Sequence, residues 1–277
     1  MRGVSHIPGR PLKTPSSQFP VFDLGVGPYL PVQALQARLR TAVADGRLPG
    51  LLLLLEHEPV ITLGSRAGVH DLRSCAAQTA PPMQAGPGLP PASAVQVVES
   101  ERGGQATLHA PGQLVSYPIV PIPGHDLSGY VKGLEQANIL VLAEFGIHGE
   151  RRPGKPGVYV TRDKISSVGL RCQRWVSSHG TSLNVTVDLR LFDAIVSCGE
   201  THLQQTSIER LTGVVPNMAD VKQAYLRAVK QVFGWELSPM RPLSYERVEA
   251  ELGLGADMPT AGFEPATPGS GGQCSIP

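Results

Sequence analysis

A run of five consecutive leucines, residues 51–55, constrains the fold more than any other segment of the chain. Charged and polar residues follow it at once, so it is far shorter than the roughly 20 apolar residues that a membrane-spanning helix needs. An apolar run of this length is typical of a buried β-strand. Before it, apolar residues recur at helical spacing up to Gly46, namely Val32, Leu35, Leu39 and Val43. We therefore expect a helix that leads into a buried strand.

The same two patterns alternate along the rest of the chain and predict a mixed α/β domain. Strands are predicted at residues 95–98, 114–120, 164–172 and 175–187, and helices at residues 127–145, 217–234 and 244–252. Residues 102–112 contain several glycines and a proline, and we expect an ordered loop there.

The two ends and one internal segment have a different composition. Residues 1–22 are basic and contain no acidic residue, as in an import presequence, but prolines interrupt any amphipathic helix, so a disordered leader is the alternative. Residues 76–94 have the composition of a surface insertion, and residues 255–277 that of a disordered tail. We therefore expect one catalytic domain, residues 23–254.

Charge and cysteine content exclude several classes of function. The 24 basic and 23 acidic residues give a formal charge of +1, which favours neither a nucleic-acid partner nor an anionic membrane surface. Cysteines occur at positions 75, 172, 198 and 274, without the close Cys/His spacing of a zinc site or of a disulfide framework. A reducing compartment and no metal are the expectation.

Two residues have the chemistry for acyl transfer through a thioester. A cysteine attacks a thioester as the thiolate, and a nearby ammonium favours that form. Cys198 and Lys164 supply this pair if the fold brings them together; otherwise the lysine is a solvated charge and the cysteine a small buried apolar residue.

Glycines and histidines lie around this pair in the sequence. Glycine lets a backbone approach a ligand closely and present amide groups to a carbonyl oxygen, although turn formation explains any single glycine as well. The glycines concerned are Gly103, Gly104, Gly112, Gly169 and Gly180. His109 and His179 could line a pocket, orient a carbonyl or move a proton, or make structural hydrogen bonds; we rank His109 first.

Four segments in order resemble the motifs of the lipoyl(octanoyl) transferase family. They are RGGQATLHAPGQLVSYPI at residues 102–119, KISSVG at 164–169, HGTSLN at 179–184 and SCG at 197–199. HEPVITLGSRA and QQTSIERL also resemble family segments, so the resemblance covers about residues 51–212. It implies an α/β fold with a mixed sheet flanked by helices, like the catalytic domain of biotin and lipoate protein ligases.

The resemblance also implies a reaction and its partners. Octanoyl would pass from octanoyl-acyl carrier protein, whose phosphopantetheine carries it, to a lysine of a lipoyl domain in 2-oxoacid dehydrogenases or the glycine cleavage H protein. Cys198 would be the nucleophile and Lys164 the residue that lowers its pKa. No cofactor and no ATP would be needed, because a thioester is already activated. We expect a monomer.

The resemblance places the substrate pocket on three segments. Its residues would be Arg102, Gly103, Gly104, Gln105, Ala106, Thr107, Leu108, His109, Ser167, Val168, Gly169, Gly180, Thr181 and Ser182. The chain departs from the family pattern at Ser197, where a proline is usual, at Leu108, where an aromatic residue is usual, and at the polar pair Thr181 and Ser182.

Two other functions stay open on the sequence. An ATP-dependent lipoate or biotin-type ligase of the same fold would not require Cys198. A weakly active module that binds lipoyl domains would explain the polar pocket substitutions. The basic leader favours a mitochondrial location, with bacterial cytoplasm as the alternative.

Overall fold

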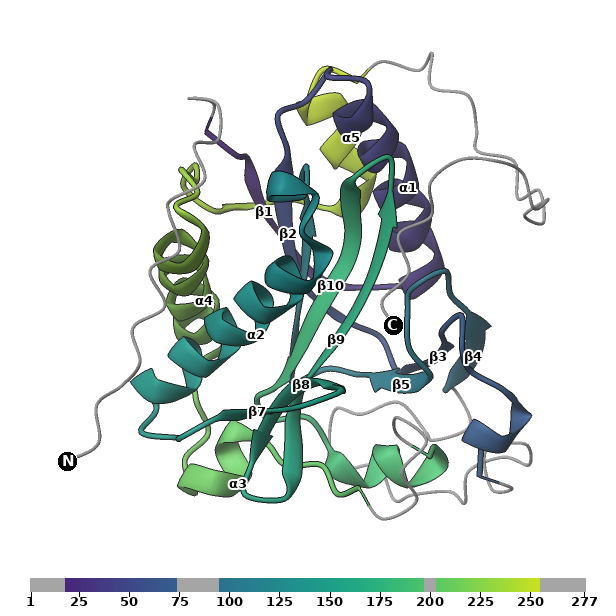
Figure 1. Cartoon of the computed structure of the whole chain (residues 1–277), viewed down its shortest axis with the longest axis vertical. Coiled ribbons are helices and arrows are strands. Elements are labelled where there is room, and N and C mark those ends of the chain that lie inside the picture. Colours follow the sequence, from purple (N-terminus) through teal and green to yellow (C-terminus); the bar gives the residue numbers. More distant parts are fainter. Residues whose placement is uncertain (1–17, 74–94, 197–202, 255–277) are drawn as a thin grey trace.

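The computed structural model describes residues 18–73, 95–196 and 203–254, and its centre is an eight-stranded sheet (Figure 1). The strand order is β11-β1-β2-β6-β10-β9-β8-β7. In chain order these strands are β1 (Val21–Gly27), β2 (Leu51–His57), β6 (Gln113–Ile119), β7 (Glu150–Arg152), β8 (Lys155–Val160), β9 (Asp163–Gln173), β10 (Val176–Asn184) and β11 (Arg241–Pro242). A smaller sheet has the order β4-β3-β5, with β3 (Val60–Leu63), β4 (Gln96–Glu99) and β5 (Ala106–His109).

The large sheet is mixed, as predicted. β1 runs parallel to β2 and to β11, whereas the β2–β6, β6–β10, β10–β9, β9–β8 and β8–β7 pairs are antiparallel. The helices are α1 (Tyr29–Ala44), α2 (Leu127–Glu144), α3 (Ile208–Thr212), α4 (Met218–Phe233) and α5 (Val248–Glu251). Among the described residues, none of the helices is long and apolar enough to cross a membrane.

The leucine run forms β2 and is buried on both of its faces. Side chains alternate along a strand, so Leu52 and Leu54 pack into the core under α2 and α4. Leu51, Leu53 and Leu55 pack into a second core under α1 and α5. Helices therefore cover both faces of the sheet (Figure 1), and a strand with water on one side would not tolerate this sequence.

The helix ends follow from capping residues in the sequence. Asp126 accepts a hydrogen bond from the Gly129 N–H at the start of α2. Asn217 does the same for the Ala219 N–H at the start of α4, which ends where Gly234 adopts a φ of 69°. The predicted helices at 127–145 and 217–234 are confirmed.

Two predictions were wrong, one about residues 102–112 and one about the start of the domain. The segment predicted as a loop contains β5, because Ala106–His109 pairs antiparallel with β3, more than 40 residues earlier in the sequence. Phe19, Val21 and Phe22 lie in the core, so the domain begins before residue 23 and includes part of the expected leader. The predicted insertion and tail lie outside the described residues.

Candidate active site

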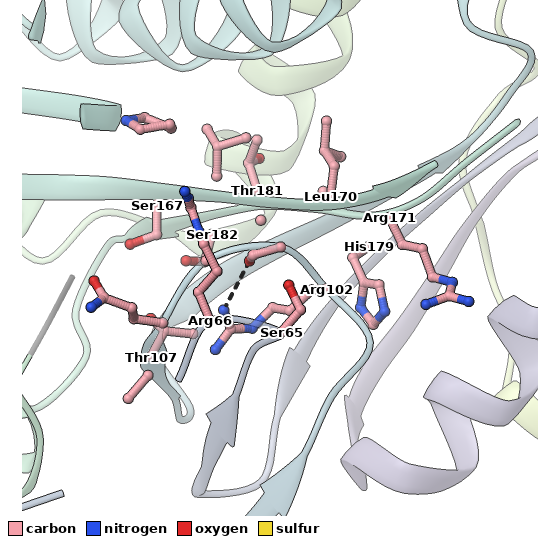
Figure 2. Close-up of a pocket in the computed structure, with 18 of the residues that line it drawn as sticks. Ser65, Arg66, Arg102, Thr107, Ser167, Leu170, Arg171, His179, Thr181 and Ser182 are labelled. Carbon is pink, nitrogen blue, oxygen red and sulfur yellow. Dashed lines mark hydrogen bonds between the residues drawn. The ribbon is translucent and has the colours of Figure 1, made fainter. Parts of the chain in front are cut away.

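A cavity of about 690 Å³ lies between β9 and β10 on one side and the segment around β5 on the other (Figure 2). All but one of the predicted substrate-pocket residues line it: Arg102, Gly103, Gly104, Gln105, Ala106, Thr107, His109, Ser167, Val168, Gly169, Gly180, Thr181 and Ser182. Lys164 lines it as well. Ser167 lies toward one end, and Arg171 and His179 lie toward the other (Figure 2).

Leu108 is the exception and is a correction to the prediction. Its side chain is fully buried with Ile61 and Phe192 in a third apolar cluster. The reason is strand alternation: Thr107 and His109 line the cavity, and the residue between them faces away from it. The leucine at this position therefore packs behind the pocket wall.

Lys164 is not a solvated charge, because its residue surface is 2% exposed. Its Nζ donates a hydrogen bond to the Pro156 carbonyl at 3.0 Å and lies 5.5 Å from the centre of the Tyr159 ring. A lysine is rarely buried so fully unless partners hold it. This burial places an ammonium in the wall of the cavity.

The main chain of Lys164 pairs with the segment that follows Cys198. The Lys164 N–H donates to the Gln204 carbonyl, and the Thr206 N–H donates to the Lys164 carbonyl, both at 2.9 Å. Before the cysteine, the Val196 N–H donates to the Asp71 carbonyl at 2.8 Å. Cys198 itself and Ser197 lie outside the described residues.

Arg102 holds the cavity wall in place through buried hydrogen bonds. Its Nε and Nη2 donate to the Thr62 hydroxyl at 2.9 and 2.7 Å, and its Nη1 donates to the Gly103 carbonyl at 3.2 Å. The Gly103 N–H in turn donates to the Leu170 carbonyl at 2.8 Å. The segment that begins at Arg102 is therefore fixed to β3 and to β9.

His109 is a neutral ring in the cavity wall. Its Nδ1 lies 2.6 Å from Oε1 of Gln113, whose Nε2 donates to Leu108 and Asn184 oxygens. An amide oxygen only accepts, so Nδ1 carries the proton and Nε2 is left as an acceptor. Burial, with the nearby His57 and Arg102, lowers the pKa of His109 to about 3. At neutral pH its Nε2 cannot donate to a carbonyl oxygen.

His179 lines the same cavity in a strained conformation. Its φ is 56°, and its N–H donates to Oε1 of Gln36 at 2.7 Å. Within the described residues its buried Nδ1 has no hydrogen-bond partner. Burial and three nearby arginines, Arg102, Arg40 and Arg171, keep its pKa well below the ordinary value. The next residue must be glycine, because a Cβ there would meet the Ser116 carbonyl of β6.

Sequence patterns missed several residues of the cavity. Tyr29, Arg66, Tyr117, Tyr159 and Arg171 line it, and they come from elements far apart in the chain. Of these, Arg171 lies in the strand predicted at residues 164–172, and Arg66 and Tyr117 lie in segments that resemble family motifs. Tyr29 and Tyr159 have no local signal that marks them as cavity residues.

His57 lies behind the wall and fixes the orientation of a cavity tyrosine. Its Nδ1 lies 3.0 Å from the Gly27 carbonyl, which only accepts, so Nδ1 carries the proton. Its Nε2 therefore accepts from the Tyr117 hydroxyl at 2.9 Å. Burial lowers the pKa of His57 to about 4. Tyr117 thus keeps its proton directed away from the cavity and presents an acceptor oxygen.

The charge of the cavity is strongly positive in a chain that is nearly neutral. Among the residues that the structure describes, its lining contains one acidic residue, Glu101, which pairs with Arg171 at 3.2 Å. The cations that line it are Arg66, Arg102, Lys155, Lys164 and Arg171. A ligand with an anionic group suits such a cavity.

Known proteins resemble the chain over most of its length. The family model of the lipoyl protein ligase A/B catalytic domain matches residues 28–230. The octanoyltransferase of Syntrophotalea carbinolica is 40% identical over 202 residues, which cover 72% of this chain and 87% of that protein. The octanoyltransferase of Roseiflexus sp. is 39% identical over 221 residues, 78% of this chain and 88% of that protein.

A solved structure agrees at the level of the fold. Lipoate-protein ligase A bound with ATP has a TM-score of 0.66 to this chain at 12% identity, and the match covers 86% of this chain and 100% of the ligase. The predicted fold, a mixed sheet flanked by helices as in lipoate protein ligases, is confirmed. The chain therefore belongs to the lipoyl protein ligase A/B catalytic domain family and, like its octanoyltransferase relatives, is an acyltransferase.

Proposed function

We propose that the chain takes octanoyl from octanoyl-acyl carrier protein onto Cys198 and passes it to a lysine of a lipoyl domain. The observation that carries this proposal is the buried ammonium of Lys164 in the cavity wall. Its main chain pairs with Gln204 and Thr206, directly after the segment that contains the cysteine. An ammonium beside a thiol favours the thiolate, which is the reactive form.

In the first step, the Cys198 thiolate attacks the thioester carbonyl and the carbon–sulfur bond to pantetheine breaks. The departing pantetheine sulfur takes a proton from the Lys164 ammonium and leaves as a thiol. In the second step, the neutral amine of the lipoyl-domain lysine attacks the acyl-enzyme, and Cys198 leaves as thiolate. Neutral Lys164 takes the proton that the amine loses, so the cycle closes without a nucleotide.

The cavity supplies the substrate contacts in this scheme. The pocket residues on β9 and β10, Ser167, Val168, Gly169, Gly180, Thr181 and Ser182, would lie along the acyl chain. The segment from Arg102 to His109 would close the opposite wall, with Leu108 supporting it from behind. The excess of cations suits the phosphate of a phosphopantetheine arm.

The relatives favour this function over the two alternatives. The ligase with bound ATP shares the fold with this chain, but at 12% identity the likeness does not extend to its ligand. The relatives at 39–40% identity are octanoyltransferases. They come from bacteria, which fits bacterial cytoplasm better than a mitochondrial location.

A nucleotide-free transfer assay tests the proposal. The purified chain is incubated with octanoyl-acyl carrier protein and a lipoyl domain, and the mass of the lipoyl domain is measured. We expect octanoylation without ATP, and its loss in Cys198→Ser. Octanoylation that requires ATP and free octanoate would support the ligase instead. Binding of both partners without any transfer would support the binding module.

A further inference from the structure

A buried carboxylate on α2 lies behind Lys164, outside the predicted site. Glu135 is 5% exposed, and α2 packs against β8 and β9 (Figure 1). Its Oε1 accepts a hydrogen bond from the Gly157 N–H at 2.9 Å, and its Oε2 lies 3.1 Å from Nε of Arg151. Both oxygens therefore have fixed partners, which a buried carboxylate requires.

The same peptide unit links Glu135 to Lys164. The Pro156 carbonyl accepts from Lys164 Nζ at 3.0 Å, and the N–H of that peptide belongs to Gly157, which donates to Glu135. In a planar trans peptide, the carbonyl and the N–H point in opposite directions. One peptide group therefore lies between the carboxylate and the ammonium and is hydrogen-bonded to both. In such a chain each bond polarises and strengthens the next.

Gly157 is the residue type that this arrangement requires. Its φ is 129°, and a Cβ at this position would meet the Ser166 carbonyl oxygen of β9 and lie 2.7 Å from Cε of Lys164. Any larger residue would therefore clash with the β9 main chain and with the lysine side chain. The Pro156–Gly157 peptide thus contacts Lys164 on one side and is hydrogen-bonded to Glu135 on the other.

Electrostatics agree with this geometry. The charged groups that face Glu135 are Arg151 on β7 and Lys164 on β9. Burial raises the pKa of Glu135 above its ordinary value, and the Gly157 N–H and these two cations offset only part of that rise by favouring the ionised carboxylate.

We propose that Glu135 is a positioning residue for octanoyl transfer: it acts through the Pro156–Gly157 peptide to hold the Lys164 ammonium at the cavity. This inference rests on the proposed function and adds a residue to it. The ionised carboxylate makes a stronger bond to Gly157 than a neutral group would, and the peptide passes that effect to the bond with Lys164.

Steady-state kinetics with octanoyl-acyl carrier protein and a lipoyl domain test the proposal. Glu135→Gln keeps an acceptor for Gly157 but removes the charge, and we expect kcat to fall about fivefold, since charge-assisted hydrogen bonds are roughly twice as strong as neutral ones. Glu135→Ala removes both, and we expect a loss of more than about 20-fold. KM for octanoyl-acyl carrier protein should stay within about twofold in both, because the contact lies behind the lysine.

The matched control is Glu144→Gln, on the same helix. Glu144 pairs with Arg227 at 2.6 Å on the surface, so its loss removes the same kind of ion pair without touching β8 or β9. We expect its kcat to equal that of the wild type. Amide hydrogen exchange at Gly157 should be fast in Glu135→Ala and slow in Glu135→Gln. This comparison distinguishes the effect of the hydrogen bond to Gly157 from the effect of the negative charge.

These outcomes distinguish a failure of the positioning role from a failure of the proposed function. If the wild type transfers octanoyl and Glu135→Ala matches Glu144→Gln in kcat, the positioning role is wrong and the proposed function stands. If the wild type itself fails to transfer octanoyl, the proposed function is wrong. If Glu135→Ala does not fold, Glu135→Gln decides: it should lose kcat, and an unchanged value would overturn the proposal.

Discussion

The proposed role of Lys164 depends on the buried position of its side chain. The ammonium lies in the cavity wall and is bonded to the Pro156 carbonyl at 3.0 Å. In Lys164→Met a side chain of similar length remains without the charge, so Cys198 should return to the ordinary thiol pKa. Such a thiol is only about 3% ionised at pH 7, and we expect the rate of octanoyl transfer to fall at least roughly 30-fold.

The pH dependence of the Lys164→Met rate separates lost charge from lost structure. The rate should rise about eightfold between pH 7 and 8, because the thiolate fraction of an ordinary cysteine rises by that factor. A variant that is equally slow at every pH would mean that Lys164 acts in some way other than on the thiol.

Arg102 links the small sheet to the cavity wall through hydrogen bonds to Thr62 of β3. Thr62→Val removes the hydroxyl that accepts from Nε and Nη2 of Arg102. Nη2 of Arg102 keeps its hydrogen bond to the Thr62 main-chain carbonyl, but the loss of the buried hydroxyl acceptor should lower the free energy of unfolding by about 2 kcal/mol in urea titrations. It should also raise KM for octanoyl-acyl carrier protein, since the segment from Arg102 forms one wall.

Thr41→Val is the control for this threonine. The Thr41 hydroxyl bonds to the Ala37 carbonyl on the exposed side of α1, so its loss should change unfolding by less than about 0.5 kcal/mol and leave KM unaltered. Equal effects of the two substitutions would show that Arg102 is not anchored through Thr62.

Much of the fold could be predicted from local sequence patterns. Helical spacing and capping residues predicted α1, α2 and α4, and the leucine run predicted β2, because these signals lie within each segment. β5 was missed since its pairing with β3 is long-range and its flanks are rich in glycine. Had β5 been recognised, strand alternation would have indicated that Leu108 faces the opposite side from Thr107 and His109.

The contacts that define the site join residues far apart in the chain. Their sequence signals are weaker than those of the helices and strands. Ordered motifs predicted most of the cavity lining from β5, β9 and β10, but not Leu170, Arg171 and Cys172 of β9. The burial of Lys164 and the peptide that joins it to Glu135 depend on how α2 packs over β8 and β9, which no local pattern specifies. Tyr29 and Tyr117 reach the cavity in the same way, from α1 and β6.

The whole fold should lose stability in acid because neutral histidines are buried beside the cavity. An unfolded histidine has a pKa near 6.5, whereas that of folded His57 is about 4. Between these values the unfolded chain binds more protons, so stability falls as pH drops. For His57 the loss between pH 7 and pH 4 is about 3 kcal/mol, and His109, with a pKa of about 3, adds to it with the same sign.

His57→Gln tests this linkage. Glutamine can still donate to the Gly27 carbonyl and accept from the Tyr117 hydroxyl, but it does not titrate. Urea unfolding at pH 7 and at pH 4 should show a smaller difference in the variant, by about 3 kcal/mol. An unchanged difference would mean that His57 is not neutral in the folded protein.

The intact mass of the protein after brief mixing with octanoyl-acyl carrier protein, without nucleotide, shows whether Cys198 carries the octanoyl group. We expect one octanoyl adduct that maps to Cys198, persists in Cys172→Ala, is absent in Cys198→Ser and disappears when a lipoyl domain is added. Cys172 is the proper comparison because it is a buried cysteine that lines the cavity. Transfer to the lipoyl domain by Cys198→Ser at the wild-type rate would contradict the account.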